Sequence, residues 1–354
     1  MATAISVSSL TMNPKEVGSF KQFIQQLVFE KPELRALHQV YTDIKMKEQI
    51  VLAGKMGLMG KKNSGTCERQ SSGAKAVLTQ KYWDPVMIED TITNCQAEVN
   101  ALFKAYYDKI QEYRDRFDIT GSDEYLFLAK EVEDAAVECL YRAIWFGDTD
   151  VAASTSDTAG LKDGDNVYAF NYFDGIWKQI FEGVTGGTIE RVDITALQGN
   201  ETVSAANAYN TILNVYKKAS AKVRANKEAK FYVDGQMFLG LMEYMQTESV
   251  NFTLDVTENG IQTLKFLGHE VVDMSFCWDE NLQYFEADST NHGAYLPHRV
   301  IFTTKENLAV GTENDEEFTN LESWYNQDDR VNKIAFGFTL DAKVLMNEYM
   351  VVAY

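Results

Sequence analysis

Two short patterns hold residues of the types that bind phosphate or calcium. Gly60-Lys61-Lys62 resembles the end of a phosphate-binding loop, G-x-x-x-x-G-K-[ST], but Lys55 stands at the first Gly position and Lys62 at the hydroxyl position. Without that hydroxyl the motif has no magnesium ligand, so the pattern favours solvated lysines over a nucleotide site.

Asp163-Gly164-Asp165 begins like a calcium-binding loop. An EF-hand needs Gly at the sixth position and Glu at the twelfth, where this chain has Tyr168 and Asp174. The acidic loop is therefore interpreted as solvated.

Histidine and cysteine are few and are not spaced as metal ligands or catalytic groups. None of the four histidines forms H-E-x-x-H, no two cysteines form C-x-x-C, and no G-x-S-x-G nucleophile motif occurs. The residues concerned are His38, His269, His292, His298, Cys67, Cys95, Cys139 and Cys277. The sequence predicts free thiols in a reducing compartment, no metal, no cofactor, no catalytic residue and no enzyme activity.

The composition limits the classes of partner. The chain has 354 residues, enough for roughly two domains, and its net charge is −19. Such a surface repels phosphate backbones and anionic lipid. The sequence also contains no apolar run of about 18 residues, the length needed to span a membrane. The first ten residues lack the basic start of a signal peptide.

Residues 41–85 predict a long β-hairpin that positions the lysines named above. Apolar stretches at Gln49–Ala53 and Ala74–Thr79 flank a segment rich in Gly and Ser, which predicts two strands joined by a polar end. A hairpin of this composition cannot bury much of itself, so a partner surface is expected.

Opposite charges gather in two segments. Lys45–Lys81 holds eight basic and two acidic residues, a net charge of +6, whereas Gly121–Asp150 holds two basic and eight acidic, a net charge of −6. The two segments would complement each other between copies of the chain, where such charges set orientation and association rate. The alternative is that both are solvated faces.

The acidic segment predicts a helix over residues 122–146. Its apolar residues form one stripe, Ser122 is an N-cap, and Gly147 ends the helix. About 25 residues at 1.5 Å each give a rod of roughly 38 Å.

An amphipathic helix is also predicted after Asn13-Pro14. Its apolar stripe comprises Phe20, Phe23, Ile24, Leu27 and Val28. Both a core helix and an arm that packs on another subunit fit this pattern.

The second half of the chain predicts mixed α/β structure, with strands dominating from Asn251 onward. Phe231–Val233 reads as a buried strand, Asp234 as the cap of the following helix, and Val271–Phe276 as a later strand.

Four segments and the order of the elements carry a resemblance to a known family. Lys81-Tyr82-Trp83-Asp84-Pro85 follows the hairpin, CLYRAIWFGD ends the acidic helix at 139–148, and residues 263–271 resemble a t-L-x-G-x-P-V strand pair with Glu270 in place of Pro. Residues 298–312 resemble the late sequence of the same family. The chain resembles the major capsid protein of tailed phages, with the Hong Kong 97-type fold.

The resemblance implies an α+β fold with five parts. They are an N-terminal arm at 1–40, an extended β-hairpin loop at 41–85, a peripheral domain at 86–165 with a spine helix at 122–146, an axial domain at 166–297, and a return to the peripheral domain at 298–354.

The resemblance also implies the function of a virion structural protein. Made in the host cytoplasm, it would self-assemble as pentamers and hexamers into an icosahedral shell that encloses double-stranded DNA without sequence-specific binding. Expected partners are a scaffolding protein, the portal and cement proteins. The expected subunit contacts are Lys55, Lys61, Lys62, Arg69 and Lys75 on the loop, Glu131, Glu133, Asp134 and Glu138 on the spine helix, and Phe20, Phe23, Ile24 and Leu27 on the arm.

Three other functions stay open at this point. Within the same architecture, the chain could form an encapsulin-like nanocompartment. Outside it, an acidic binding module and an enzyme with a site around Tyr168–Trp177 are the alternatives.

Overall fold

The computed structural model describes most of the second half of the chain and several segments of the first. The described residues are 34–56, 58–62, 71–95, 123–151, 160–162, 164–247, 254–256, 262–286, 295–313, 321–326 and 331–354. The arm residues Phe20, Phe23, Ile24 and Leu27, the loop residue Arg69, and the predicted helix cap Ser122 lie outside them.

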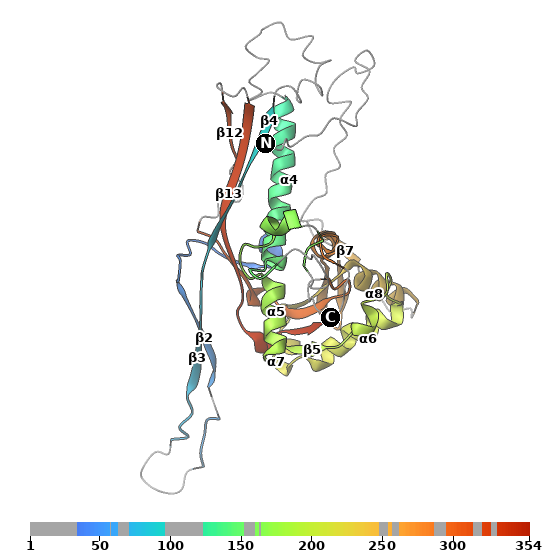
Figure 1. The fold of residues 1–354 in the computed structure, drawn as a ribbon. Coiled ribbons are helices and arrows are strands. Elements are labelled where there is room, and N and C mark those ends of the chain that lie inside the picture. Colours follow the sequence, from blue (N-terminus) through green and yellow to red (C-terminus); the bar gives the residue numbers. More distant parts are fainter. Residues whose placement is uncertain are drawn as a thin grey trace.

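A two-stranded hairpin projects from the body of the molecule (Figure 1). Its strands are β2 (Gln49–Met56) and β3 (Ala76–Tyr82), which pair antiparallel with a register shift between Ala53 and Met56. The predicted strand pair is therefore present, and β3 begins two residues later and ends three residues later than expected.

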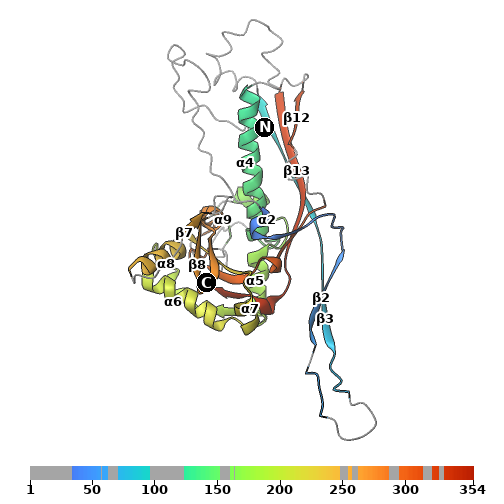
Figure 2. The same cartoon turned by 180° about the vertical axis from the view of Figure 1, so that it is seen from behind.

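The longest described helix lies along a sheet (Figures 1 and 2). Helix α4 (Asp123–Phe146) runs beside β4 (Val86–Cys95), β12 (Leu321–Asn326) and β13 (Val331–Val344). Both β4 and β12 pair antiparallel with β13, and β11 (Leu308–Gly311) joins its far end. Burying Ile88, Ile334 and Phe338 removes apolar surface from water at this sheet.

Helix α4 ends before Gly147, as predicted, because two backbone segments meet there. A Cβ on Gly147 would lie 2.4 Å from the carbonyl oxygen of Phe173, and one on Gly175 would lie 2.8 Å from the nitrogen of Gly147. The Gly175 N–H donates to the Gly147 oxygen at 2.8 Å. Close approach therefore requires glycine here, whereas the left-handed conformation that often ends helices is not used.

The second half of the chain builds a sheet covered by helices α6 (Ala205–Lys218) and α8 (Gly235–Thr247) (Figure 1). Among the described residues its strand order is β5-β14-β10-β6-β9-β8-β7. The bounds are β5 Glu190–Val192, β6 Ala229–Val233, β7 Leu254–Val256, β8 Gln262–Phe266, β9 His269–Asp273, β10 Val300–Thr304 and β14 Val351–Ala353. The rings of Phe231 and Phe302 stack in its core at 4.2 Å.

Strands β10 and β14 belong to the predicted return segment 298–354, yet they lie in this sheet, while β11, β12 and β13 of the same segment belong to the sheet that contains β4. The segment thus contributes to both sheets. The five domain limits stay a prediction.

The predicted strand Val271–Phe276 is wrong at its end. Strand β9 stops at Asp273, and helix α9 (Ser275–Leu282) begins almost at once. The Asp273 carboxylate accepts a hydrogen bond from the Ser275 N–H at 2.9 Å, which turns the chain into the helix.

Three helices bring tryptophans together between the two sheets. The ring of Trp278 on α9 lies 5.1 Å from that of Trp145 on α4 and 5.1 Å from that of Trp177 on α5 (Ile176–Thr185). All three side chains are buried, so this cluster fixes the end of α4 against the rest of the body.

Candidate functional site

The base of the hairpin is fixed to the body by a small apolar joint. Trp83 is 3% exposed and packs with Ile44 and Ala309. Gly311 makes room for it, because a Cβ at that position would lie 2.9 Å from the indole ring. The Trp83 N–H donates to the Glu48 oxygen at 2.9 Å, which closes the base of the ribbon.

Polar contacts tie the same base to β13. The Lys81 ammonium donates to the carbonyl oxygen of Val344, and the Asp84 N–H donates to the Asp341 carboxylate at 2.8 Å. Asp341 is fully buried and pairs with Lys343 at 3.1 Å. Burial raises the pKa of Asp341, and Lys343 opposes that rise.

The backbone itself turns the chain into the hairpin. Asp43 and Lys47 have left-handed φ angles of 59° and 62°. Each costs roughly 1–2 kcal/mol for a residue with a side chain, so the surrounding joint must hold them in place. The hairpin therefore leaves the body in a defined direction.

Beyond the joint, the ribbon exposes apolar side chains. Val51, Leu58, Met59, Leu78 and Tyr82 are among the exposed large hydrophobic residues of the described chain. A lone two-stranded hairpin is at best marginally stable in water, and clustered exposed apolar groups mark contact surfaces. The arrangement fits a segment completed by a partner.

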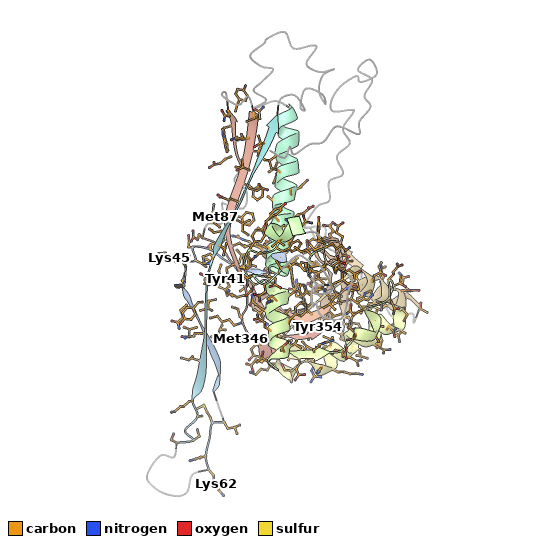
Figure 3. All side chains as sticks on the ribbon, viewed as in Figure 1. Tyr41, Lys45, Lys62, Met87, Met346 and Tyr354 are labelled. Atoms are coloured by element: carbon orange, nitrogen blue, oxygen red, sulfur yellow. The ribbon has the colours of Figure 1, made fainter. Side chains whose placement is uncertain are left out.

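The predicted loop lysines lie toward the free end of the hairpin. Lys61, Lys62 and Lys75 are exposed, and Figure 3 shows Lys62 far from the body. Lys55 is placed only by its backbone in β2.

The predicted acidic residues lie on α4. Glu133 and Glu138 are exposed, Asp134 is partly buried, and Glu131 is placed only by its backbone. The free end of the hairpin and α4 extend to opposite ends of the molecule (Figures 1 and 2). One chain does not bring the two sets of charges together, and their pairing between copies stays a prediction.

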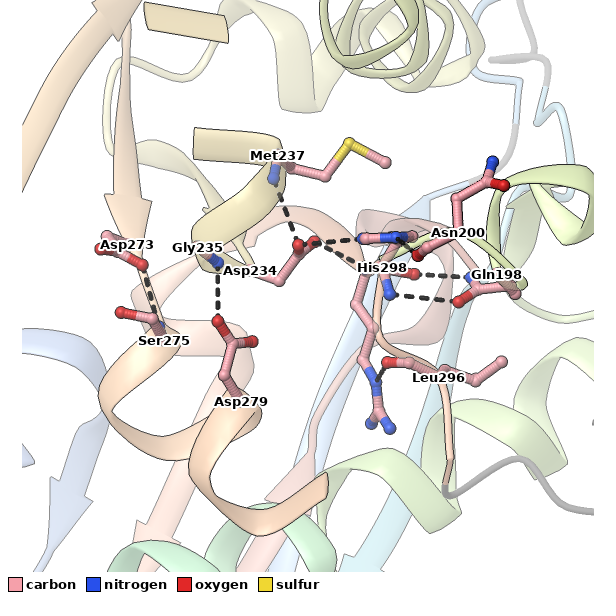
Figure 4. Close-up of polar contacts among 11 residues, drawn as sticks. Gln198, Asn200, Asp234, Gly235, Met237, Asp273, Ser275, Asp279, Leu296 and His298 are labelled. Carbon is pink, nitrogen blue, oxygen red and sulfur yellow. Dashed lines mark hydrogen bonds and ion pairs between the residues drawn. The ribbon is translucent and has the colours of Figure 1, made fainter. Parts of the chain in front are cut away.

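A buried polar network, which the sequence did not predict, joins β6, α8, α9 and β10 (Figure 4). Asp234 is 1% exposed; its carboxylate accepts hydrogen bonds from the Met237 N–H at 3.2 Å and the Arg299 N–H at 2.8 Å. The first of these bonds caps α8, as predicted for Asp234. Asp279 accepts a bond from the Gly235 N–H at 3.2 Å at the same helix end.

The contacts of His298 within this network favour its charged form. Its Nδ1 lies 3.3 Å from the Asp234 carboxylate, and its Nε2 lies 2.9 Å from the carbonyl oxygen of Asn200. Both neighbours present oxygen atoms to the ring, so the charged imidazole, which donates from both nitrogens, suits this position. Burial lowers the pKa of His298, but the bonds to Asp234 and Asn200 outweigh it and raise the pKa above its ordinary value.

Arg299 places a buried cation next to His298. Its side chain is fully buried, its guanidinium lies 4.6 Å from the Trp177 ring centre and 5.1 Å from that of Phe146, and its Nε donates to the Leu296 oxygen at 2.6 Å. Such stacking stabilises a cation that burial would otherwise disfavour. Through Arg299 the network thus links the start of β10 to α4 and α5.

The network predicts that stability depends on pH. Burial, with Asp234 close by, raises the pKa of Asp279 to about 7, so the folded chain keeps a proton that the unfolded chain releases. This stabilisation is complete below about pH 4 and is lost as the pH rises through about 7, by at most about 1.4 kcal/mol per pH unit. Denaturant unfolding of the unassembled chain at pH 4 to 8 should show the slope, and Asp279→Asn should flatten it.

The control for that experiment is Glu228→Gln, which changes an exposed acid outside the network. It should leave the slope as in the wild type. Equal slopes for Asp279→Asn and the wild type across this window would show that Asp279 does not bind the proton.

Neither a metal site nor a membrane-spanning helix is found among the described residues. No group of three or more His, Cys, Asp or Glu side chains there is arranged to hold a metal ion. No described helix is both long and apolar enough to cross a bilayer.

Solved structures with similar backbones include phage and GTA capsids. The capsid of an empty GTA particle matches with a TM-score of 0.52 and 12% identity, over 93% of this chain and 91% of that one. The capsid of a native GTA particle matches with a TM-score of 0.51 and 11% identity, over 99% of both chains. A structure of Mycobacterium phage Ogopogo matches with a TM-score of 0.51 and 10% identity, over 97% of this chain and 99% of that one.

The chain has the fold of a phage capsid protein. The expected resemblance is confirmed at this level, as is the mixed α/β architecture. Comparison with protein-family models gives no match, and comparison with curated protein sequences gives none. The capsid fold is therefore apparent from backbone geometry rather than from sequence identity.

Proposed function

We propose that this chain is the major capsid protein of a tailed phage, which self-assembles into an icosahedral shell around double-stranded DNA. The observation that supports the proposal is the hairpin of a capsid fold, fixed at its base by Trp83 and exposed along β2 and β3. Its role is structural, not catalytic.

In this proposal each hairpin lies on a neighbouring copy. Such a contact uses different surfaces on the two partners, and it closes into rings where the rotation between neighbours is a fifth or a sixth of a turn, which gives the proposed pentamers and hexamers. Each contact is modest, but a closed shell makes many at once and gains avidity. A scaffolding protein, portal and cement proteins are the proposed partners, and the virion capsid is the proposed location after synthesis in the host cytoplasm.

Electron microscopy of the purified chain tests the proposal. The chain is expressed alone and together with its neighbouring gene products, and closed particles of uniform size are expected in at least one preparation. A species that stays strictly monomeric at high protein concentration and low salt in both preparations would contradict the function.

Charge reversal of the hairpin end is expected to slow assembly. Changing Lys61 and Lys62 to Glu removes the positive charge that would steer the hairpin to an acidic neighbour, so we expect roughly tenfold slower particle formation and a weaker dependence on salt. Light scattering follows the rate, and circular dichroism checks that the monomer stays folded.

The matched control reverses two exposed lysines elsewhere, Lys217 and Lys227. The double change alters net charge equally and should assemble nearly as fast as the wild type. Equal rates for the wild type and the hairpin variant would rule out charge steering by Lys61 and Lys62.

A further inference from the structure

The register of the hairpin assigns its side chains to two faces. Gln49 pairs with Tyr82, Val51 with Gln80, and Ala53 with Leu78, whereas Ile50 pairs with Lys81 and Leu52 with Thr79. Because directly opposed residues share a face and successive residues alternate, the first three pairs form one face and the last two form the other.

One of these faces is turned toward the chain's own body. Ile50 is half-buried and packs against the cluster of Ile44, Trp83 and Ala309. Lys81 is also half-buried and bonds to the Val344 oxygen. The opposite face, which carries Val51, Leu78 and Tyr82, is here named the outer hairpin face.

The outer hairpin face combines exposed apolar groups with polar groups that already have partners. Val51 is 56% exposed, Leu78 63% and Tyr82 47%. Between them, the Gln49 amide donates to the Gln80 side-chain oxygen. Because these two amides already share a hydrogen bond, removing them from water costs less free energy than burying two unpaired amides. A partner can therefore cover this face at a reduced desolvation cost.

We propose that the outer hairpin face is the docking surface for a second copy of this chain and supplies most of the affinity of that contact. This inference rests on the proposed function and adds which face binds and which chemistry dominates. Apolar burial contributes to affinity in proportion to area, whereas exposed charges at a rim mainly steer. The lysines at the hairpin end would then orient a contact that Val51, Leu78 and Tyr82 hold.

Charge complementarity favours a second copy as the occupant. The hairpin end carries exposed Lys61, Lys62 and Lys75 on a chain whose net charge is −19. Helix α4, which carries the exposed acids Glu133 and Glu138, and the end of the hairpin extend in opposite directions, so these acids can meet a hairpin end only from another copy (Figures 1 and 2).

Polar substitution of the three apolar residues tests the inference. Val51→Ser, Leu78→Ser and Tyr82→Ser together should raise the protein concentration needed for particle formation about 100-fold or more. The matched control, Tyr168→Ser with Leu239→Ser and Leu267→Ser, replaces exposed apolar residues outside the hairpin and should assemble as the wild type does. Assembly of the hairpin variant at the wild-type concentration would overturn the inference.

A second measurement guards against a hairpin that loses its own structure. A photo-cross-linking amino acid at Leu78 in otherwise wild-type chain should join light and heavy isotope-labelled copies in mixed particles, whereas the same group at Leu239 should not. Particles that form normally but give adducts at Leu78 only within one copy would refute the docking face and leave the shell function intact. If the wild type itself forms no particles, the proposed function fails instead.

Discussion

Replacing Trp83 by Ala is expected to abolish particle formation while the body of the chain stays folded. Removing a buried Trp costs about 3–5 kcal/mol, and here that loss falls on the small cluster with Ile44 and Ala309, apart from the main cores. The docked hairpin would become a minor state, and apparent affinity falls with the population of the competent state. Hydrogen exchange of residues 49–82 and electron microscopy measure the two effects.

Trp83→Phe is the matched control, because it keeps an aromatic ring beneath Gly311. It should retain most of the particle yield and most of the exchange protection. If Trp83→Ala gives normal particles, the joint does not set the direction of the hairpin. Global unfolding of the variant would instead place Trp83 in the main core.

Replacing Asp234 by Ala is expected to destabilise the whole chain by about 3–5 kcal/mol. The change removes one partner of a buried charge pair and leaves His298 and Arg299 without that carboxylate, besides removing the cap of α8. The pKa of His298 should fall, because burial lowers it and Asp234 is the strongest influence that raises it. Denaturant unfolding and NMR titration of His298 measure these effects.

Asp193→Ala is the control variant. Asp193 also accepts hydrogen bonds from a backbone N–H and a side-chain hydroxyl, both of Thr195, but its carboxylate is exposed. It should cost about 1 kcal/mol or less. Asp234→Asn, which keeps an acceptor for the Met237 N–H, should lie between the two. Equal stability of Asp234→Ala and the wild type would contradict a structural role for the network.

The elements that the sequence predicted well are those whose pattern is local. Helix α4 shows an uninterrupted apolar stripe, and β2 and β3 flank a segment rich in Gly. Strand β4 was missed because Glu89 and Asp90 are adjacent and hide its alternation. The short strand β11 is buried throughout, so it has no period to detect.

The candidate site divides in the same way. The exposed lysines of the hairpin could be predicted from charge alone, because they need no tertiary partner. The network could not, since Asp279 and His298 lie 45 and 64 residues after Asp234 in the sequence. The three residues meet only through the tertiary arrangement of β6, α9 and β10. The available signal was a charged residue directly beside a buried strand, as at Asp234 after β6 and Arg299 before β10.

The way the hairpin continues into the body has a mechanical consequence. Strand β3 leads through Trp83–Pro85 into β4, and all ten residues of β4 have a partner on β13. A pull on the far end of the hairpin is directed along β4 (Figure 1). The ladder is then loaded in shear, so its hydrogen bonds must fail together instead of unzipping one by one. In the proposed shell, a pull on the hairpin would therefore be resisted by this whole ladder without any covalent link.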